Sequence, residues 1–411
     1  MTTSRCRFCS AHLRHTFLDL GMSPLANRYL PPHQLHQMEP FYPLHVYVCE
    51  HCLLTQLEEF ASPEQIFSDY AYFASYSDTW LQHARLYTEM VVARFGLNSQ
   101  TQVVEIASND GYLLQYFAAK GIPVLGIEPA ANVAEVAVEK GIPTRVEFFG
   151  EGLARQLVVE GRSANLIVGN NVLAHVPQLN DFVRGLKTLL KPQGVMTLEF
   201  PHLLRLMAEN QFDTIYHEHF SYFSFTTVEK IFAAHDLTIF DVEELPTHGG
   251  SLRVYARHSE DPSTAVASRG TAMRAKEEAA GLTRLGGYLS YAEQVTATKR
   301  KLLAFLIEAK GRGKSVVGYG APAKGNTLLN YCGIRSDFID YTVDRSPHKQ
   351  GYFLPGTHIP IHHPDRVKET CPDYLLILPW NLTDEIVQQM GYIREWGGQF
   401  VVPIPEVRVI S

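Results

Sequence analysis

Short apolar runs alternate with helix-prone segments over a long central part of the chain. Val, Ile and Leu fill five of these runs, which predict buried strands at residues 102–107, 123–129, 165–173, 194–200 and 251–257. Between them, residues 109–121 and 130–141 each predict a helix that a glycine ends. Strands and helices that alternate in this way predict a doubly wound α/β sheet.

A second α/β unit is expected near the C-terminal end. Its strands are predicted at residues 314–320, 338–344, 374–380 and 399–405, the last of these being the final strand. Residues 326–331 predict a helix between the first two of them. Helical patterns also occur at residues 79–95 and at residues 260–310, the latter rich in Ala, Glu, Lys and Arg. Residues 1–65, by contrast, look irregular.

Four of the six cysteines form two C-x-x-C pairs, Cys6 with Cys9 and Cys49 with Cys52. Zinc prefers four soft ligands in a tetrahedron, and two such pairs supply four thiolates. A redox C-x-x-C would stand at a helix start in a thioredoxin-like unit, which neither pair does. We therefore expect a structural zinc ion that staples a small domain and, with all four positions filled, does no chemistry.

These patterns together predict an α/β protein divided into four parts. A small zinc-binding domain is expected at 1–65, a Rossmann-like domain at 66–258, a helical connector at 259–310 and a second Rossmann-like domain at 311–411.

The composition of the chain argues mainly against two classes of partner, nucleic-acid polymers and membranes. The 411 residues are 45% hydrophobic and 19% charged, as in ordinary globular proteins, and the net charge of -7 gives no sign of a nucleic-acid polymer as partner. The first residues are polar, and no apolar run is long enough to span a bilayer, which argues against a membrane partner. We expect a cytoplasmic protein and, for a chain of several domains, a monomer.

The first strand of the central unit ends at a turn of small residues. Glu105 closes the strand, Ala107, Ser108 and Asn109 make the bend, and Gly111 opens the helix. Nucleotide cofactors bind at this place in Rossmann-like sheets, but the G-x-G-x-x-G that a dinucleotide requires is absent. S-adenosylmethionine has no phosphate, and an acid meets its charged amino-acid end. The turn thus favours S-adenosylmethionine, while a Rossmann-like fold with another ligand stays open.

Further cofactor residues are expected where the neighbouring strands end. Glu128, followed by Pro129, stands where an acid accepts hydrogen bonds from both ribose hydroxyls. Phe148 would give an apolar wall for adenine, and Asn170 and Asn171 close the third of the five predicted strands.

Over nearly its whole length the chain resembles the nucleotide-sugar C-methyltransferases of deoxysugar and surface-polysaccharide pathways. The matching motifs are the four cysteines, E-I-A-S-N-D-G at 105–111, N-N-V-L-A-H-V at 170–176, Y-H-E-H at 216–219 and G-Y-G-A-P-A-K-G-N at 318–326. The family has a zinc domain, a class I methyltransferase domain and a C-terminal Rossmann-like domain in this order.

The resemblance implies methyl transfer from S-adenosylmethionine to C3 of a nucleotide-linked 4-keto-6-deoxy sugar, in the biosynthesis of a surface polysaccharide or natural product. His219 is the implied general base, with Tyr216 and Glu218 as helpers, His175 in the same pocket, and Tyr70 as an active-site tyrosine.

Carbon methylation requires that a base removes the proton beside the ketone, that a donor stabilises the enolate oxygen, and that the carbon then attacks the methyl group in line. Histidine suits the first task, and Tyr216, His175 or Tyr222 could perform the second. Adjacent strand residues face opposite ways, so a turn is needed to bring both Glu218 and His219 inward. His217 and His219 could alternatively bind a metal, although no third ligand is evident.

The glycine loop of the C-terminal unit is expected to hold the diphosphate of the substrate, through Gly320, Lys324 and Asn326. Asp344 stands where a dinucleotide fold has its ribose-binding acid, so bound NAD is an alternative. Arg253, after a Gly-Gly turn, is a further candidate for substrate contact.

Three other functions stay open at this point: an O- or N-methyltransferase, an NAD-dependent oxidoreductase that uses the C-terminal loop, and a zinc-bearing scaffold with a vestigial methyltransferase fold. Deuterium exchange at C3 of the sugar, hydride transfer, and failure to bind S-adenosylmethionine would distinguish them.

Overall fold

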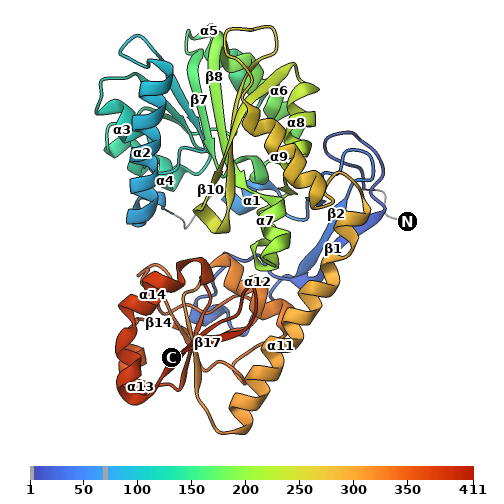
Figure 1. Ribbon diagram of the computed structural model, residues 1–411. Coiled ribbons are helices and arrows are strands. Elements are labelled where there is room, and N and C mark those ends of the chain that lie inside the picture. The colour runs from blue at the N-terminus through green and yellow to red at the C-terminus, as the bar shows by residue number, and fades with distance from the viewer. Residues whose placement is uncertain (1–3, 68–72) are drawn as a thin grey trace. The chain divides into compact units, whose positions relative to one another are not determined.

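The computed structural model describes residues 4–67 and 73–411 of the chain (Figure 1). It contains two compact units, each made of three separate stretches. The first unit comprises residues 1–14, 49–202 and 220–285, and the second comprises 15–48, 203–219 and 286–411. The four-part division expected from the sequence stays a prediction, because these units are defined by packing and not by order along the chain.

A seven-stranded sheet in the order β10-β11-β8-β7-β4-β5-β6 forms the centre of the first unit. The five strands from β8 to β6 are parallel, while β11 pairs antiparallel with β8 and β10 antiparallel with β11. The strands are β4 (Val103–Ile106), β5 (Val124–Ile127), β6 (Thr144–Arg145), β7 (Ala164–Asn170), β8 (Leu190–Pro201), β10 (Leu237–Leu245) and β11 (Ser251–His258).

Helices cover both faces of this sheet, with α2, α3 and α4 on one side and α6, α8 and α9 on the other (Figure 1). The predicted doubly wound α/β arrangement is therefore present. The helices of this unit are α1 (Pro63–Phe67), α2 (Asp78–Phe95), α3 (Leu114–Ala118), α4 (Ala131–Glu139), α5 (Glu151–Val159), α6 (Leu179–Leu189), α8 (Phe225–Ala233) and α9 (Ser268–Ala279).

Helix α2 shows why these segments form where they do. The Ser77 hydroxyl accepts a hydrogen bond from the Trp80 amide, which caps the start, and Gly96 ends the helix with φ +63°. Its buried positions recur every three or four residues and include Trp80 and Tyr87. Burial of each such aromatic side chain contributes about 1.5–3 kcal/mol, so packing on the sheet rather than helix propensity fixes α2.

The second unit has its own six-stranded sheet, in the order β14-β13-β12-β15-β16-β17. All of its pairs are parallel except that of β16 with β17. The strands are β12 (Val316–Tyr319), β13 (Thr342–Val343), β14 (Ile361–His362), β15 (Tyr374–Ile377), β16 (Gln399–Val402) and β17 (Arg408–Ile410). The expectation that the run at 399–405 is the final strand is wrong, since β17 follows and turns back along it.

The helices of the second unit include α11, whose 21 residues make it the longest of the described helices. They are α7 (Leu203–Ala208), α10 (Gly286–Leu289), α11 (Tyr291–Gly311), α12 (Ala323–Cys332), α13 (Arg366–Thr370) and α14 (Thr383–Gln389). Across the described residues, no helix combines the length and the apolar character needed to cross a membrane.

The N-terminal stretch is more regular than the sequence suggests. In the second unit, β1 (His15–Ser23) pairs antiparallel with β2 (Tyr42–Val48), and in the first unit β3 (Thr55–Leu57) pairs with β9 (Ser221–Tyr222). The register of β1 shifts twice, which breaks the alternation of apolar and polar positions by which strands are predicted. The expectation of an irregular stretch is therefore wrong here.

Candidate active site and metal centre

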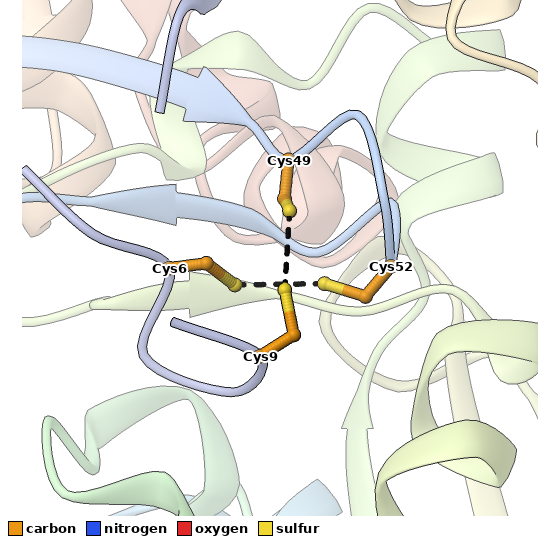
Figure 2. A group of neighbouring side chains, drawn as sticks. All are labelled: Cys6, Cys9, Cys49 and Cys52. Carbon is orange, nitrogen blue, oxygen red and sulfur yellow. Dashed lines mark hydrogen bonds between the residues drawn. The ribbon is translucent and has the colours of Figure 1, made fainter. Parts of the chain in front are cut away.

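The four cysteines of the first unit point their sulfur atoms toward one centre (Figure 2). All four Sγ atoms lie within 4.8 Å of one another, and the Cys6–Cys52 and Cys9–Cys49 pairs are each 3.5 Å apart. Tetrahedral zinc with bonds of about 2.3 Å separates its sulfur ligands by roughly 3.8 Å. The donor set and its spacing therefore fit zinc, with no ligand position left for catalysis.

The two cysteine pairs have the same backbone structure. The amides of Ser10 and Leu53, four residues after the first cysteine of each pair, donate to the carbonyls of Cys6 and Cys49 at 2.9 Å. Both residues have positive φ, 62° and 66°. Each C-x-x-C segment thus folds as a tight knuckle whose shape depends on local hydrogen bonds. In addition, Gln56 Nε2 lies 3.2 Å from Cys6 Sγ and stabilises the thiolate from outside the cluster.

The predicted cofactor turn follows β4 and contains three residues with left-handed backbone. Ala107, Asn109 and Gly111 have φ of 58°, 48° and 76°. At Gly111 an added Cβ would also lie 3.1 Å from the Ile142 side chain, so glycine is required there for space as well as for conformation. The bend brings the backbone of residues 107–111 across the carboxyl end of β4, where a cofactor can approach it closely.

Glu105, at the end of β4, is fully buried, and neither of its carboxylate oxygens has a hydrogen bond of good geometry. Burial raises the pKa of Glu105 well above its ordinary value, with a smaller opposing contribution from the nearby Tyr112 hydroxyl. A buried carboxyl group of this kind stays protonated unless a positive partner lies beside it. The charged amino-acid end of S-adenosylmethionine supplies one, so the residues present fit this cofactor.

Glu128 ends β5 beside the same turn. Its two oxygens accept hydrogen bonds from the amides of Asn109 and Ala130, both at 2.9 Å. Each carboxylate oxygen has a second lone pair, so the ribose hydroxyls can still bind. Pro129 follows, and Phe148 is 40% exposed, which leaves its ring accessible to an adenine.

The carboxyl end of β7 contributes two asparagines and reveals neighbours that the sequence did not indicate. Asn170 Nδ2 lies 3.3 Å from the Tyr112 hydroxyl, and Asn171, at φ 56°, lies 2.9 Å from His248 Nε2. Trp80 of α2 is stacked on Tyr112 and meets His248 edge to face, with ring centroids 5.9 and 5.0 Å away. Tyr112 directly follows the cofactor turn in sequence, whereas Trp80 and His248 lie far from it along the chain, so only the fold brings these two side chains there.

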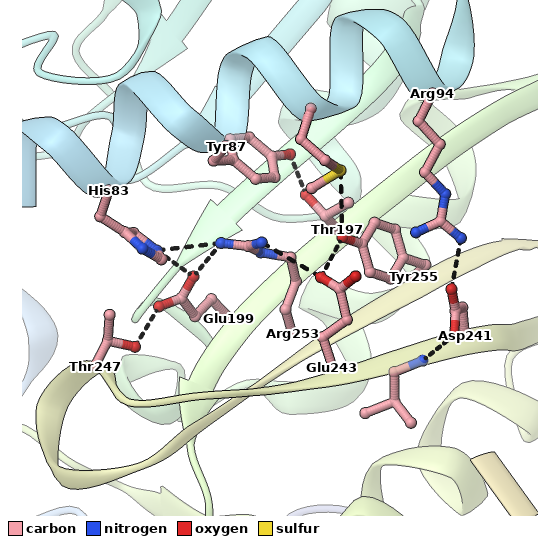
Figure 3. Close-up of polar contacts among 12 residues, drawn as sticks. His83, Tyr87, Arg94, Thr197, Glu199, Asp241, Glu243, Thr247, Arg253 and Tyr255 are labelled. Carbon is pink, nitrogen blue, oxygen red and sulfur yellow. Dashed lines mark hydrogen bonds and ion pairs between the residues drawn. The ribbon is translucent and has the colours of Figure 1, made fainter. Parts of the chain in front are cut away.

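Arg253, a candidate for substrate contact, belongs instead to a buried polar network that links α2, β8, β10 and β11 (Figure 3). Its guanidinium bonds Glu199 at 3.0 Å and Glu243 at 3.5 Å and covers the ring of Tyr87 at 4.6 Å. Burial alone would raise the pKa of Glu199, but His83 and Arg253 lower it overall. The structure thus gives Arg253 an internal ion pair, and its contact with substrate stays a prediction.

The Y-H-E-H motif lies in the second unit and forms a tight turn. The His219 amide donates to the Tyr216 carbonyl at 2.9 Å. Glu218 and His219 therefore lie in a turn and not on a strand, as the sequence analysis required. His219 Nδ1 lies 2.9 Å from the Thr214 carbonyl, which can only accept, so Nδ1 carries the hydrogen. The ring of Tyr216 lies against the imidazole with centroids 4.1 Å apart. A neutral His219 therefore has its lone pair on Nε2.

Glu218 is buried in the same turn, and Asn27 Nδ2 donates a hydrogen bond to its Oε1 at 2.6 Å. Burial raises the pKa of Glu218 to about 7, and the Asn27 hydrogen bond opposes this rise. The Tyr29 hydroxyl donates to the Ala321 carbonyl at 2.5 Å, so the same segment also contacts the C-terminal loop. Asn27 carries no motif and was not predicted.

His217 does not support the alternative of an H-x-H metal site. Its Nε2 lies 3.2 Å from the Pro43 carbonyl, its ring meets Tyr42 edge to face, and burial lowers its pKa. Among residues 4–67 and 73–411, the four cysteines are the one group of three or more His, Cys, Asp or Glu that could hold a metal ion.

Two further candidates for the catalytic site belong to the first unit. His175 meets Phe67 edge to face with centroids 5.4 Å apart, and Tyr222 is buried in β9, opposite Thr55 of β3. Tyr70 lies outside the described residues. The catalytic roles of all six candidates stay predictions.

Hydrogen bonds to Asp344 stabilise the glycine loop that follows β12. The carboxylate accepts hydrogen bonds from the amides of Ala321 and Ser346, each at 2.8 Å. Gly320 has φ 86°, and an added Cβ would lie 2.6 Å from Pro379, so no other residue fits. Backbone amides bind both oxygens of Asp344, as they bind both oxygens of Glu128, so Asp344 fixes the shape of the loop and the NAD alternative stays an open prediction.

The other two candidates of this loop lie on α12. Lys324 Nζ bonds Asn381 at 2.8 Å and covers the ring of Trp380 at 4.5 Å. Asn326 is buried, and its Nδ2 donates to the Ala26 carbonyl at 2.6 Å. Their contact with a diphosphate stays a prediction.

Comparison with known proteins identifies the family. Three family models match in sequence order: a zinc binding domain over residues 6–67, a methyltransferase domain over 80–242 and a C-methyltransferase C-terminal domain over 246–405. The C-methyltransferase NovU of Streptomyces niveus is 37% identical over 414 aligned residues, which cover 99% of this chain and 96% of NovU. The chain belongs to this C-methyltransferase family.

More distant similarities are confined to part of the chain. The ubiquinone biosynthesis O-methyltransferase of Bartonella tribocorum (strain CIP 105476 / IBS 506) is 27% identical over 96 residues, 23% of this chain and 39% of its own. The solved structure of the PH0226 protein from Pyrococcus horikoshii OT3 covers 48% of this chain and 99% of its own, with 16% identity and a TM-score of 0.38.

The predicted family, fold class and enzyme class are confirmed. This C-methyltransferase uses S-adenosylmethionine and carries a zinc-binding domain with a four-cysteine cluster.

Proposed function

We propose that this C-methyltransferase acts on a nucleotide-linked 4-keto-6-deoxy sugar and methylates its C3. The observation that carries the proposal is the hydrogen bond between His219 Nδ1 and the Thr214 carbonyl, which leaves the lone pair of the neutral ring on Nε2. A carbon beside a ketone becomes nucleophilic only after a base removes its proton, and an imidazole held in one tautomer suits that task. The name of NovU as a C-methyltransferase supports a carbon acceptor.

The proposed roles follow from this chemistry. His219 Nε2 takes the C3 proton, and the Thr214 carbonyl and the Tyr216 ring hold the imidazole in place. A hydroxyl or imidazole from Tyr216, Tyr222 or His175 donates to the enolate oxygen, while Glu218 and Asn27 fix the shape of the turn. S-adenosylmethionine supplies an electrophilic methyl group to the enolate carbon.

We further propose that the C-terminal loop binds the diphosphate of the substrate. Gly320 allows a close approach to the backbone, and Lys324 and the amides at the start of α12 attract negative charge. Asn326 supports this loop from within by its hydrogen bond to Ala26.

The proposal is tested by mass spectrometry of a panel of nucleotide-linked 4-keto-6-deoxy sugars incubated with enzyme and S-adenosylmethionine. His219→Ala is compared with His363→Ala, which alters a mostly exposed histidine of the same unit. Deuterium exchange at C3 is followed in parallel with S-adenosylhomocysteine in place of the methyl donor.

The wild type and His363→Ala should each add a single methyl group to one sugar and catalyse deuterium exchange at its C3. His219→Ala should show neither activity. Exchange that persists in His219→Ala would mean that another group is the base. Cofactor binding without methylation of any sugar would contradict the sugar assignment and point to another enolisable carbon acid.

A further inference from the structure

The cofactor turn departs from the commoner E-x-G-x-G-x-G pattern at Asn109, and the structure shows what this side chain does. Asn109 has φ 48°, a conformation that glycine adopts freely and asparagine tolerates better than other residues with a Cβ. An asparagine at this position therefore costs more than glycine unless its side chain makes a compensating contact.

That contact joins two separate parts of the first unit. Asn109 Oδ1 accepts a hydrogen bond from the Ala74 amide at 2.9 Å, and both residues are buried. The backbone amide of Asn109 donates at the same time to Glu128 Oε2, also at 2.9 Å. One residue thus connects the acid expected at the cofactor ribose with the short turn that precedes α2.

Asp110, the residue after Asn109, also binds the short turn that precedes α2. Asp110 Oδ2 accepts a hydrogen bond from the Ser75 amide at 3.2 Å. Lys140 Nζ bonds the Ser75 hydroxyl and the Asp110 carbonyl, each at 3.0 Å, and pairs with the Asp110 carboxylate at 3.4 Å. Two consecutive side chains of the cofactor turn therefore hold two consecutive amides of the turn before α2.

The turn so held decides where α2 begins. Residues Ala74–Tyr76 form a single 3-10 turn, and Ser77, the next residue, caps α2. One helical turn later, Trp80 is stacked on Tyr112, beside the buried Glu105 and Asn170. A shift of the Ala74–Ser77 turn would displace Trp80 from the cofactor turn.

We propose that Asn109 is a positioning residue, which docks the Ala74–Ser77 turn onto the cofactor turn and so holds Trp80 as one wall of the S-adenosylmethionine site. The inference rests on the cofactor site of the first unit and does not depend on the identity of the sugar. In this role Asn109 acts through the Ala74 amide, so its loss weakens cofactor binding but leaves the chemical step intact.

Asn109→Gly is the direct test, because glycine keeps the left-handed backbone and removes only the side chain. Asp236→Gly is the matched control: Asp236 has φ 53°, lies in the same unit, and loses a side-chain bond to Lys187 on the surface. The dissociation constant of S-adenosylmethionine is measured by calorimetry without sugar, followed by KM and kcat with the methyl acceptor.

The Asn109→Gly variant loses one buried hydrogen bond and should bind S-adenosylmethionine up to roughly tenfold more weakly than the wild type. KM for S-adenosylmethionine should rise by the same factor, with kcat at saturation unchanged. Asp236→Gly should leave the dissociation constant, KM and kcat as in the wild type. An unchanged dissociation constant in Asn109→Gly, or a fall in kcat alone, would overturn the inference.

Ala74→Pro removes the donor of the same bond from the other side. Proline suits the first position of a helical turn, and Phe73, at φ −107° and ψ 118°, already has the backbone required before proline. If the bond is responsible, Asn109→Gly and Ala74→Pro together should weaken binding no more than the larger single effect. Effects that multiply instead would show that Asn109 acts by another route.

Discussion

At the scale of single residues, Glu218 shows how burial and one hydrogen bond set the state of a carboxyl group. It is buried in the Y-H-E-H turn, with Asn27 as its donor at 2.6 Å. Burial outweighs the Asn27 hydrogen bond and raises the pKa of Glu218 to about 7. The folded protein therefore holds a proton on Glu218 at pH values where the unfolded chain has lost it.

Stability should consequently depend on pH through Glu218. Between about pH 4.5 and 7 the folded state binds more protons than the unfolded state, so the free energy of unfolding falls as pH rises through this window. The neutral variant Glu218→Gln removes this loss. Relative to the wild type it should gain up to about 3 kcal/mol at pH 8 and little at pH 4.5.

Urea denaturation of both proteins at the two pH values measures this difference. Glu385→Gln, an exposed acid of the same unit, serves as the control and should show no such dependence on pH. A gain for Glu218→Gln that is equal at pH 4.5 and 8 would mean that Glu218 is ionised in the folded protein throughout.

At the scale of elements, the zinc knuckles are the part of the fold that the sequence predicts best. Cys6 and Cys9, like Cys49 and Cys52, are close in sequence, and each knuckle depends on a hydrogen bond across four residues. A local pattern therefore contains almost all the information that the structure needs. Strands β4, β5 and β7 were predictable for a similar reason, since each is a short local run in which Val, Leu and Ile predominate.

Other elements could not be predicted from local patterns. Two register shifts interrupt the alternation of apolar and polar positions in strand β1. Strand β14 has only two residues and is too short to give a signal. The contacts of Trp80 with Tyr112, and of Asn27 with Glu218, join residues that are distant in sequence, and neither Trp80 nor Asn27 belongs to a motif. Such pairs depend on how the elements pack, which a single sequence does not reveal.

Removal of one zinc ligand tests the knuckles as an element. Cys9→Ser should abolish stoichiometric zinc, measured by atomic absorption, and lower the melting temperature, because binding free energy at a structural zinc site is also folding free energy. Cys371→Ser changes an exposed cysteine outside the cluster and should keep both zinc content and melting temperature. Full zinc content in Cys9→Ser would show that the four cysteines are not the site.

The network around Arg253 allows a second test at this scale, because it separates an internal role from contact with substrate. Arg253→Met would leave Glu199 buried without its cation and should lower the free energy of unfolding by roughly 3–5 kcal/mol. Arg269→Met, which alters a half-exposed partner of Asp241, should cost about 1 kcal/mol or less. A normal melting temperature with a raised KM for the sugar would instead support Arg253 as a substrate residue.

At the scale of the whole molecule, each unit is built from three stretches, and this is the feature that sequence order conceals. Residues 203–219, which carry the Y-H-E-H turn, pack with 15–48 and the C-terminal part, although the methyltransferase family model spans 80–242 without a break. The zinc knuckles and the cofactor turn belong to the first unit, and the glycine loop belongs to the second. The order of the motifs along the chain therefore does not indicate which unit each motif belongs to.

This division predicts where each ligand should slow hydrogen exchange. S-adenosylmethionine at about 100 times its dissociation constant stabilises the bound state by roughly 2.7 kcal/mol, which should slow amide exchange up to about a hundredfold where opening breaks the site. Protection is expected at residues 105–111 and 126–130 and at the Ala74–Ser77 turn. Residues 318–326 should respond to a nucleoside diphosphate and not to S-adenosylmethionine. If S-adenosylmethionine alone protects 318–326 as strongly as 105–111, the loop serves the cofactor, and the proposed diphosphate site is wrong.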